Sequence, residues 1–539
     1  MTAVDDVRGP LADDRPARER TAPPGIRQHV ERLREVRRQA LDGPGEAATR
    51  AQHERGRLTV RERLGLLLDE GSFQELEPLR RHRAGGLGLE DERPRTDGVV
   101  TGRGTVDGRP VFVRAHDFRC LGGSLGAAHA EKIHRLMDLA EAAGAPLVDI
   151  GDSAGARIQE GATALAGYGG IFRRQVRSSG MIPQISVVLG PCAGGAAYAS
   201  ALSDFVFAVR GVSRMYVTGP DVVRTVTGEE TTHEDLGGAD VHGRTSGLAH
   251  FVHDDEESCL AAVRHLLSLL PANNRELPPR EEPFDPPGRR TPRLLDLVPA
   301  DPRRPYDMKA VIEEIADDGD WLEVHASWAA NVICALARLD GDVVGVVANQ
   351  PSVLAGSLDI DASDKAARFV QTCDAFNIPL VTLVDVPGFL PGGGQERRGI
   401  LRHGAKLLYA YCNATVPRVS LILRKAYGGG YIAMDSRSAG AGIALAWPHN
   451  EIAAMGAGSA VDVVRRREIE EAADPAAARA EFAKRYEQEL LHPCHAAERG
   501  LVDDVIDPAA TRAALTGALE MLRTKHARLP DRKHGNPPV

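Results

Sequence analysis

The sequence predicts an α/β protein in which one layered fold occurs twice. Three observations point to this class: a length of 539 residues, an internal repeat, and an alternation of apolar strands with amphipathic helices. A single hydrophobic core rarely extends beyond about 250 to 300 residues, so two domains are expected. The composition, 43% hydrophobic and 26% charged, is typical of a folded enzyme.

The internal repeat relates the two halves of the chain. A shift of 233 positions aligns residues 108–155 with 341–388 without a gap and gives 16 identities in 48 positions, Asp152 with Asp385 among them. With one extra residue the alignment continues, and IPQISVVLGPCAGG lies over VPRVSLILRKAYGG. We therefore expect two domains related by duplication.

Each copy has the same expected order of elements. Helices are predicted over 127–144 and 362–377, where apolar residues recur at helical spacing. Short apolar runs that follow them, 146–150 and 379–386, predict buried strands. Strands that alternate with helices indicate a sheet covered by crossover helices.

Composition changes mark the boundaries of the predicted domains. The first residues are polar and charged, and a helix with charges on most faces is expected over 25–41. The proline-rich, charged stretch 271–292 predicts an extended linker. The expected organisation is a disordered N-terminus over 1–24, an N-terminal domain over 25–280, a C-terminal domain over 281–525 and a flexible tail over 526–539.

Charge and cysteine usage exclude several classes of function. A formal net charge of −9 gives no attraction to nucleic acid. The charged N-terminus lacks an apolar signal region and no stretch of about 18 apolar residues occurs, so we expect a cytoplasmic protein without a membrane span. The seven cysteines are far apart, which predicts reduced thiols, and no ligand motif predicts a metal.

Two glycine-rich turns are the strongest candidates for a functional site. GPCAGGAAYA, residues 190–199, predicts a buried strand that turns through Gly194 and Gly195 into a helix, and RKAYGGGYIAM, residues 424–434, is its counterpart in the second copy. Glycine lets the backbone approach a ligand, and the first turn of a helix leaves N–H groups unpaired. Such a turn can stabilise an oxyanion without any reactive side chain. An isolated Gly-Gly pair more often serves close packing, but two equivalent pairs favour a binding role.

The chain resembles the carboxyltransferase β subunit of biotin-dependent acyl-CoA carboxylases, of the propionyl-CoA and acetyl-CoA type, over residues 25–525. The motifs that carry the resemblance are GARIQEG (155–161), IPQISVVLGPCAGGAAYASALSDF (182–205), VTGPDVVRTVTGE (217–229), ANQPSVLAGSLDIDASDKAARFV (348–370), FNIPLVTLVDVPGFLPG (376–392) and RHGAKLLYAY (402–411). The resemblance implies two tandem crotonase-like (ClpP/crotonase) carboxyltransferase domains and a homohexamer built as a trimer of dimers. Each active site would lie between the N-terminal domain of one subunit and the C-terminal domain of its partner.

The resemblance also implies the reaction and its partners. The carboxyl group would pass from carboxybiotin to the α-carbon of an acyl-CoA, giving malonyl-, methylmalonyl- or longer alkylmalonyl-CoA. Biotin would be carried by a separate α subunit with biotin carboxylase and carrier domains. A small ε-type subunit is a possible further partner. The biotinylation motif Ala-Met-Lys-Met is absent, DMKA at 307–310 being nearest, and no P-loop occurs, so this chain is expected to bind neither covalent biotin nor ATP.

Residue roles follow from the resemblance position by position. Gly194 and Gly195 would bind the thioester oxygen, and Gly429 and Gly430 the ureido oxygen of biotin, although the two roles could be exchanged. The biotin nitrogen would take the α-proton, and the resulting enolate would attack carbon dioxide released locally. Residues implied in substrate binding are Gly123, Ser124, Gly155, Ala156, Arg157, Ala193, Tyr431 and Ile432.

The sequence departs from the family pattern at several positions near these motifs. Gly430 replaces a usual Ala, and Ile432 stands where propionyl-type members often have Asp. An apolar residue at 432 predicts tolerance of acyl groups other than propionyl, with modest selectivity. Ala127, Ala154 and a more basic PGGGQERRG segment also differ from the family.

Other interpretations remain open at this stage. GGSLG matches the G-x-S-x-G pattern, so an acyl-CoA hydrolase with Ser124 as nucleophile is an alternative. Cys192 could be a nucleophile or a packed residue, and Asp152 and Asp385 could be general bases or caps. Decarboxylation of malonyl-type thioesters or transcarboxylation would use the same turns, and a non-catalytic scaffold is a further alternative. Acyl chain length, the identity of the α subunit and the pathway cannot be determined from the residues.

Overall fold

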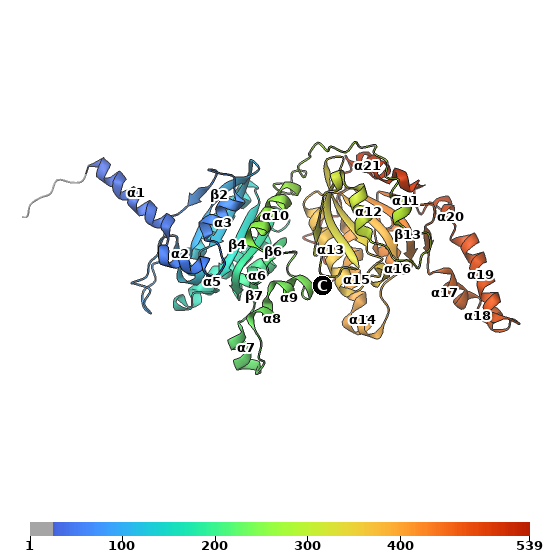
Figure 1. Cartoon of the computed structure of the whole chain (residues 1–539), viewed down its shortest axis with the longest axis horizontal. Coiled ribbons are helices and arrows are strands. Elements are labelled where there is room, and N and C mark those ends of the chain that lie inside the picture. The colour runs from blue at the N-terminus through green and yellow to red at the C-terminus, as the bar shows by residue number, and fades with distance from the viewer. Residues whose placement is uncertain (1–24, 539) are drawn as a thin grey trace, which may run out of the picture.

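The computed structural model describes residues 25–538 and contains two α/β units joined by an extended segment (Figure 1). The predicted disorder of residues 1–24 lies outside the described residues. Each unit is built on an eight-stranded mixed sheet whose buried strands are mainly apolar but also carry buried charges such as Asp152 and Arg424. The predicted fold class is confirmed.

The N-terminal sheet has the strand order β1-β2-β3-β4-β5-β6-β8, with β7 paired to β5. The first three strands are antiparallel and the remainder parallel. The strands are β1 (Gln74–Leu76), β2 (Val99–Val106), β3 (Arg109–His116), β4 (Leu147–Ser153), β5 (Gln184–Ala193), β6 (Phe205–Val209), β7 (Arg214–Tyr216) and β8 (Phe251–His253).

The C-terminal sheet repeats this topology strand for strand. Its order is β16-β14-β13-β12-β11-β10-β9, with β15 paired to β13. The strands are β9 (Trp321–Val324), β10 (Val332–Leu339), β11 (Asp342–Asn349), β12 (Leu380–Val386), β13 (Arg418–Tyr427), β14 (Ile443–Ala446), β15 (Glu451–Ala453) and β16 (Asp504–Val505). The shared order supports the duplication that the internal repeat predicts.

Helices cover both sheets. Those of the first unit are α1 (Ile26–Asp42), α2 (Glu46–His53), α3 (Val60–Leu67), α4 (Ala127–Ala143), α5 (Ala162–Ser178), α6 (Gly195–Ala201), α7 (Pro220–Thr227), α8 (His233–Gly237), α9 (Ala239–Arg244) and α10 (Glu256–Leu269). Those of the second are α11 (Leu294–Leu297), α12 (Met308–Ile315), α13 (Ile360–Ala375), α14 (Gly393–Arg398), α15 (Ile400–Asn413), α16 (Gly428–Ala433), α17 (Ala457–Val464), α18 (Arg466–Glu470), α19 (Pro475–Leu490), α20 (Pro493–Glu498) and α21 (Thr511–Leu522).

The predicted repeat helices correspond to α4 and α13. Helix α4 begins after Gly126 and ends at Gly144 in a left-handed conformation, while its face with Ile133 and Leu136 is buried against the sheet. Helix α13 begins at the side-chain cap of Asp359, which accepts the amide of Ala362. The helix predicted over 25–41 is α1, which is exposed along nearly its whole length.

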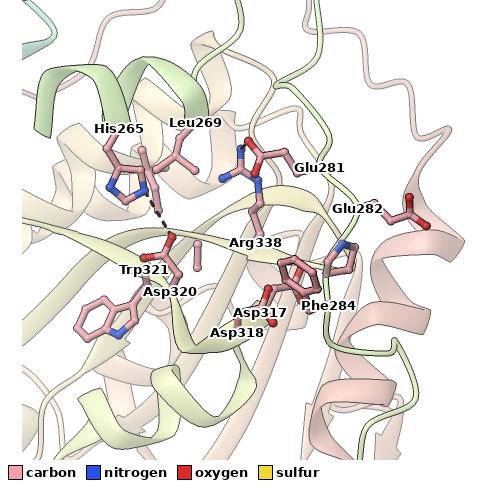
Figure 2. A pocket seen from close by; sticks show the side chains of 13 residues that line it. His265, Leu269, Glu281, Glu282, Phe284, Asp317, Asp318, Asp320, Trp321 and Arg338 are labelled. Carbon is pink, nitrogen blue, oxygen red and sulfur yellow. Dashed lines mark hydrogen bonds and ion pairs between the residues drawn. The ribbon is translucent and has the colours of Figure 1, made fainter. Parts of the chain in front are cut away.

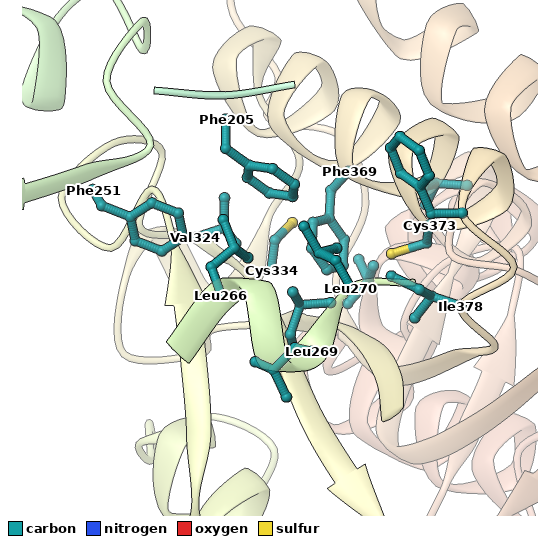
Figure 3. Close-up of a cluster of buried hydrophobic side chains, with 14 of the residues drawn as sticks. Phe205, Phe251, Leu266, Leu269, Leu270, Val324, Cys334, Phe369, Cys373 and Ile378 are labelled. Carbon is teal, nitrogen blue, oxygen red and sulfur yellow. The ribbon is translucent and has the colours of Figure 1, made fainter. Parts of the chain in front are cut away.

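The two units share an apolar interface rather than only a linker. Residues 271–292 contain neither helix nor strand, as the proline-rich composition predicts. Beside this segment, Phe205 and Leu266 of the first unit belong to the same buried cluster as Val324, Cys334 and Phe369 of the second (Figure 3). Burial of this surface holds the two units together as one body.

A small cavity of about 120 Å³ lies at the same junction (Figure 2). It is lined by side chains from α10, the linker and the start of the second sheet, and the imidazole of His265 lies 3.5 Å from the carboxylate of Asp320 across it. None of the predicted site residues lines this cavity.

Candidate functional site

The first glycine turn lies at the carboxyl end of β5, where the chain enters α6. Gly194 has a φ of +56°, a conformation that side chains rarely adopt, and its amide donates to the carbonyl of Tyr216 at 3.0 Å. Helix α6 begins at Gly195, so the amides of its first turn lack partners within the helix. The turn therefore presents the amide of Gly195 at the edge of the sheet, whereas the amide of Gly194, also expected to be a donor, is occupied by the carbonyl of Tyr216.

Gly195 packs directly on an aromatic ring. A Cβ atom at this position would lie 2.5 Å from the ring of Tyr168, a buried residue of α5. Gly155 approaches the same turn, since a Cβ atom there would lie 2.9 Å from the carbonyl oxygen of Ala193. Glycine at both positions allows a close approach that no other residue permits.

The structure brings the other predicted N-terminal residues to this turn. The amide of Leu125 donates to the carbonyl of Gly155 at 2.8 Å, and the hydroxyl of Ser153 donates to that of Gly123 at 2.7 Å. Ala156 pairs with Leu125 in an isolated parallel bridge. Residues 122–126, 153–157 and 193–195 thus form one site at the carboxyl ends of the parallel strands, where α/β proteins commonly bind ligands.

Arg157 lies next to this site in a network of buried ion pairs. Its side chain is 1% exposed and its guanidinium donates to Asp97 and Glu160 at 2.8 Å each, and to the carbonyl of Ser124 at 2.9 Å. These partners bind the guanidinium within the chain and hold the loop of Ser124 in place. The substrate-binding role implied by the resemblance stays a prediction.

The second glycine turn lies at the carboxyl end of β13. Gly428 has a φ of +55°, which matches Gly194, and α16 begins there. The structural counterparts of Gly194 and Gly195 are therefore Gly428 and Gly429. Gly428 is absent from the residues expected from the family, although the repeat alignment already pairs it with Gly194.

Gly429 and Gly430 face different surroundings within this turn. A Cβ atom at Gly429 would meet only the ring of Phe389, at 3.7 Å, so space is open above it. Gly430 is buried, and a Cβ atom there would lie 2.8 Å from the Cα atom of Gly388. Tyr431 is half-buried and Ile432 is 48% exposed beside the turn, which leaves Ile432 accessible to a ligand.

The alternative nucleophiles lack the partners that catalysis requires. The hydroxyl of Ser124 donates to the carbonyl of Leu121 at 2.7 Å. His129, five residues after Ser124 in the chain, is bound through Nδ1 to the carbonyl of Asp97 at 2.9 Å and stacks on His116. No histidine bonds Ser124 among the described hydrogen bonds, so the geometry does not support a hydrolase.

Cys192 and the paired aspartates are also buried. Cys192 is 1% exposed, and burial raises the pKa of its thiol, which keeps it protonated and unreactive. Asp152 and Asp385 are both fully buried, in ion pairs with Arg63 and Arg424. They serve neither as exposed bases nor as caps.

Across residues 25–538, no three His, Cys, Asp or Glu side chains come together in a group that could hold a metal ion. None of the helices in this range combines the length and the apolar composition that a membrane span requires.

The fold and the site define a class of α/β enzyme with two duplicated domains. Each domain has backbone amides at a glycine turn and no catalytic side chain at the apex of that turn.

The carboxyl transferase domain family model matches residues 51–537. The propionyl-CoA carboxylase carboxyltransferase subunit of Haloferax mediterranei is 53% identical over 95% of this chain and 100% of its own length. The methylmalonyl-CoA decarboxylase subunit alpha of Propionigenium modestum is 49% identical over 95% and 99%.

A solved structure of transcarboxylase 12S, described as a hexamer assembly with methylmalonyl-coenzyme A and methylmalonic acid bound, superposes with a TM-score of 0.94 at 49% identity and covers 97% of this chain and 100% of its own. The chain belongs to the carboxyl transferase family, and it is a carboxyltransferase subunit that acts on acyl-CoA.

Proposed function

We propose that this chain transfers a carboxyl group from carboxybiotin, carried by a separate subunit, to the α-carbon of a short acyl-CoA. The observation that carries the proposal is that the same turn, with glycine at φ near +55°, occurs at the carboxyl end of the same strand in both units. Two oxygen-bearing reactants that both develop negative charge require two such sites.

The N-terminal turn is proposed to bind the thioester oxygen of acyl-CoA. When the α-proton leaves, charge moves to this oxygen, and the amide of Gly195 would lie where it develops, while the amide of Gly194 shapes the turn by donating to the carbonyl of Tyr216. Loss of one such donor raises a barrier by roughly 3 to 4 kcal/mol. The nearby loops at Gly123 and Gly155 would exclude water and orient the acyl group.

The C-terminal turn is proposed to bind the ureido oxygen of biotin. The nearest side chain to a Cβ atom at Gly429 would be the ring of Phe389 at 3.7 Å, which leaves room for a ligand, and the amides of Gly429 and Gly430 lie in the first turn of α16. Carboxybiotin supplies the carboxyl group and a nitrogen that accepts the α-proton. The contribution of this chain would be to hold the ureido oxygen by backbone donors.

We further propose that a complete active site needs a second copy of the chain. The two turns lie in separate units, at α6 and at α16 (Figure 1). Large apolar side chains are exposed beside both: Leu165 and Tyr198 in the N-terminal unit are 66% and 53% exposed, and Leu401 in the C-terminal unit is 80% exposed. Exposed apolar surface of this kind is typical of an interface. A dimer that apposes unlike units, within a hexamer, would cover it.

Ile432 is proposed to line the acyl pocket. Its side chain is apolar and about half exposed beside Gly429 and Gly430. Contacts of this kind distinguish acyl groups weakly, since a buried methylene contributes about 0.8 kcal/mol. We propose that acetyl, propionyl and somewhat longer groups are all accepted.

Decarboxylation or transcarboxylation is the second candidate, because relatives of 49% to 50% identity carry those names. The same turns would serve the reaction in reverse. The direction would then depend on the partner subunit that delivers or removes the carboxyl group.

A reconstituted assay tests the proposal. The purified chain is combined with a biotinylated α subunit of an acyl-CoA carboxylase and assayed on acetyl- to octanoyl-CoA. Activity that requires the biotinylated partner supports it, whereas efficient turnover by the chain alone refutes it. Ile432→Asp should narrow the range of acyl groups, and an unchanged preference would remove Ile432 from the pocket.

A further inference from the structure

Both glycine turns follow a register shift in the strand that leads to them. In the first sheet Gly151 lies opposite Val188, but Ser153 lies opposite Cys192, so two residues of β4 face four residues of β5. The second sheet has the same shift: Val384 lies opposite Ile422 and Val386 opposite Ala426. In both sheets the part of the strand beyond the shift pairs with a new neighbour, β7 or β15. The shift therefore sets the direction in which each turn points.

In the N-terminal unit the shift is held by a guanidinium from a distant helix. Arg63 of α3 donates to Asp152 at 3.0 Å and to the carbonyl of Leu189, inside the shifted segment, at 2.7 Å. Glu256 of α10 accepts two further bonds from Arg63, at 2.7 and 2.9 Å. We name Arg63, Asp152 and Glu256 the N-terminal clamp.

In the C-terminal unit the guanidinium comes from the shifted segment itself. Arg424 donates to Asp385 at 3.0 Å, and Asp385 also accepts the amide of Lys425 at 3.2 Å. The same guanidinium donates to the carbonyls of Asp301 and Arg304 at 2.9 and 3.0 Å. We name Arg424 and Asp385 the C-terminal clamp.

Both clamps pair a buried aspartate with a buried arginine, but the arginine comes from a different element in each unit. In the repeat alignment Asp152 matches Asp385, but Arg424 matches Gly190. A Cβ atom at Gly190 would lie 2.0 Å from the carboxylate of Asp152, so no side chain fits there. Arg63 supplies the guanidinium instead. The aspartate is common to both halves, while the arginine has a different origin in each.

We propose that these clamps position the two glycine turns for carboxyl transfer, with Arg63 and Asp152 serving the acyl-CoA turn and Arg424 and Asp385 the biotin turn; the assignment of ligands rests on the proposed function. A shifted segment leaves backbone groups without ladder partners, and the clamps bond the carbonyl of Leu189 and the amide of Lys425. Both arginines and both aspartates are at most 1% exposed. Buried ion pairs are often no better for stability than apolar residues, whereas their directional bonds fix a geometry.

The test compares Arg63→Lys and Arg424→Lys with a matched control. Arg512 is as deeply buried and bonds the carbonyl of Ile315 at 2.7 Å and Asp317 at 2.5 Å, but its segment leads to neither turn. Arg512→Lys therefore disturbs a buried pair of the same kind elsewhere. Each variant is measured by amide hydrogen exchange of peptides 187–196 and 421–430, by thermal unfolding, and by kcat and KM in the reconstituted assay.

We expect Arg63→Lys to speed exchange about tenfold in 187–196 only, and Arg424→Lys in 421–430 only. Each should lower kcat about tenfold or more and change the KM of acyl-CoA by less than about threefold, because positioning acts on the reacting geometry. Arg512→Lys should lower the unfolding temperature while both peptides and kcat stay unchanged.

Two results would overturn the proposed clamps. One is amide exchange that rises equally in both peptides in either clamp variant. The other is an Arg63→Lys protein whose exchange, unfolding temperature and kcat change in the same way as those of Arg512→Lys. Local loosening with unchanged kcat would support the clamp and refute the assignment of that turn to a substrate. If Arg63→Lys does not fold, Asp152→Asn gives the same test, because it keeps the side-chain shape and leaves Arg63 its bonds to Glu256.

Discussion

Alanine substitution at the two equivalent glycines should have opposite effects. Gly195 and Gly429 occupy the same place in the two turns, but their surroundings differ. A Cβ atom at Gly195 would lie 2.5 Å from the ring of Tyr168, whereas one at Gly429 would lie 3.7 Å from that of Phe389. The first distance is a clash and the second an ordinary van der Waals contact.

The magnitude follows from the displacement that each change requires. Gly195→Ala must move the turn or the Tyr168 ring by about 1 Å to restore contact distance, which in a packed core costs about 1 to 3 kcal/mol. A misplacement of about 1 Å at a reacting centre lowers the rate roughly 100-fold. Gly429→Ala needs no movement and replaces glycine in a helix, so the free energy of unfolding should stay the same or rise by about 0.5 to 1 kcal/mol.

Calorimetric unfolding and initial rates of carboxylation measure both effects. We expect Gly195→Ala to unfold at a lower temperature and to lose about 100-fold in kcat, and Gly429→Ala to unfold no earlier than the parent protein. A Gly195→Ala protein with unchanged kcat would refute the role of this turn in catalysis. Lower activity in a fully stable Gly429→Ala protein would indicate a ligand that approaches Gly429 closely.

Two more predictions concern side chains of the N-terminal unit. Ser124→Ala should retain kcat within about threefold, because its hydroxyl donates to the carbonyl of Leu121 and accepts a long bond from Arg157 but contacts no catalytic base, and a loss of catalysis on the scale of a nucleophile would support the hydrolase. Burial raises the pKa of Asp204 to about 6 from 3.8, so its contribution to stability is complete below pH 3.8 and is lost as pH rises through 6, an effect of about 3 kcal/mol. Asp204→Asn should therefore flatten the pH dependence of the unfolding temperature between about pH 4 and 6, and parallel curves for the two proteins would contradict this.

Much of the fold could be predicted because its determinants are local or repeated. Helix α4 follows from apolar spacing between two glycines, and the extended linker follows from its prolines. The duplication is visible in the alignment of 108–155 with 341–388, and the structure repeats it in the strand order of both sheets. Patterns of this kind need no knowledge of distant contacts.

The roles of buried charges could not be predicted in the same way. Arg157 lies in a family motif, and nothing in its sequence neighbours indicates that Asp97, 60 residues earlier, accepts from its guanidinium. The pairing of Arg63 with Asp152 likewise spans 89 positions. Such contacts arise only when strands and helices pack, so for Arg157 the sequence alone leaves a binding role and a structural ion pair equally open.

Gly428 shows what an internal repeat adds when it is read residue by residue. The family resemblance points to Gly429 and Gly430, while the alignment of the two halves pairs Gly194 with Gly428, and the matching φ angles agree with the alignment. The amides of a turn keep their directions when the backbone conformation of the turn is kept. In both halves that conformation depends on the register shift before the turn and on the buried ion pair that holds the shifted segment. The two halves of the chain therefore hold the same turn in two ways. Both have the buried aspartate and the glycine with positive φ, and they differ only in which element supplies the arginine.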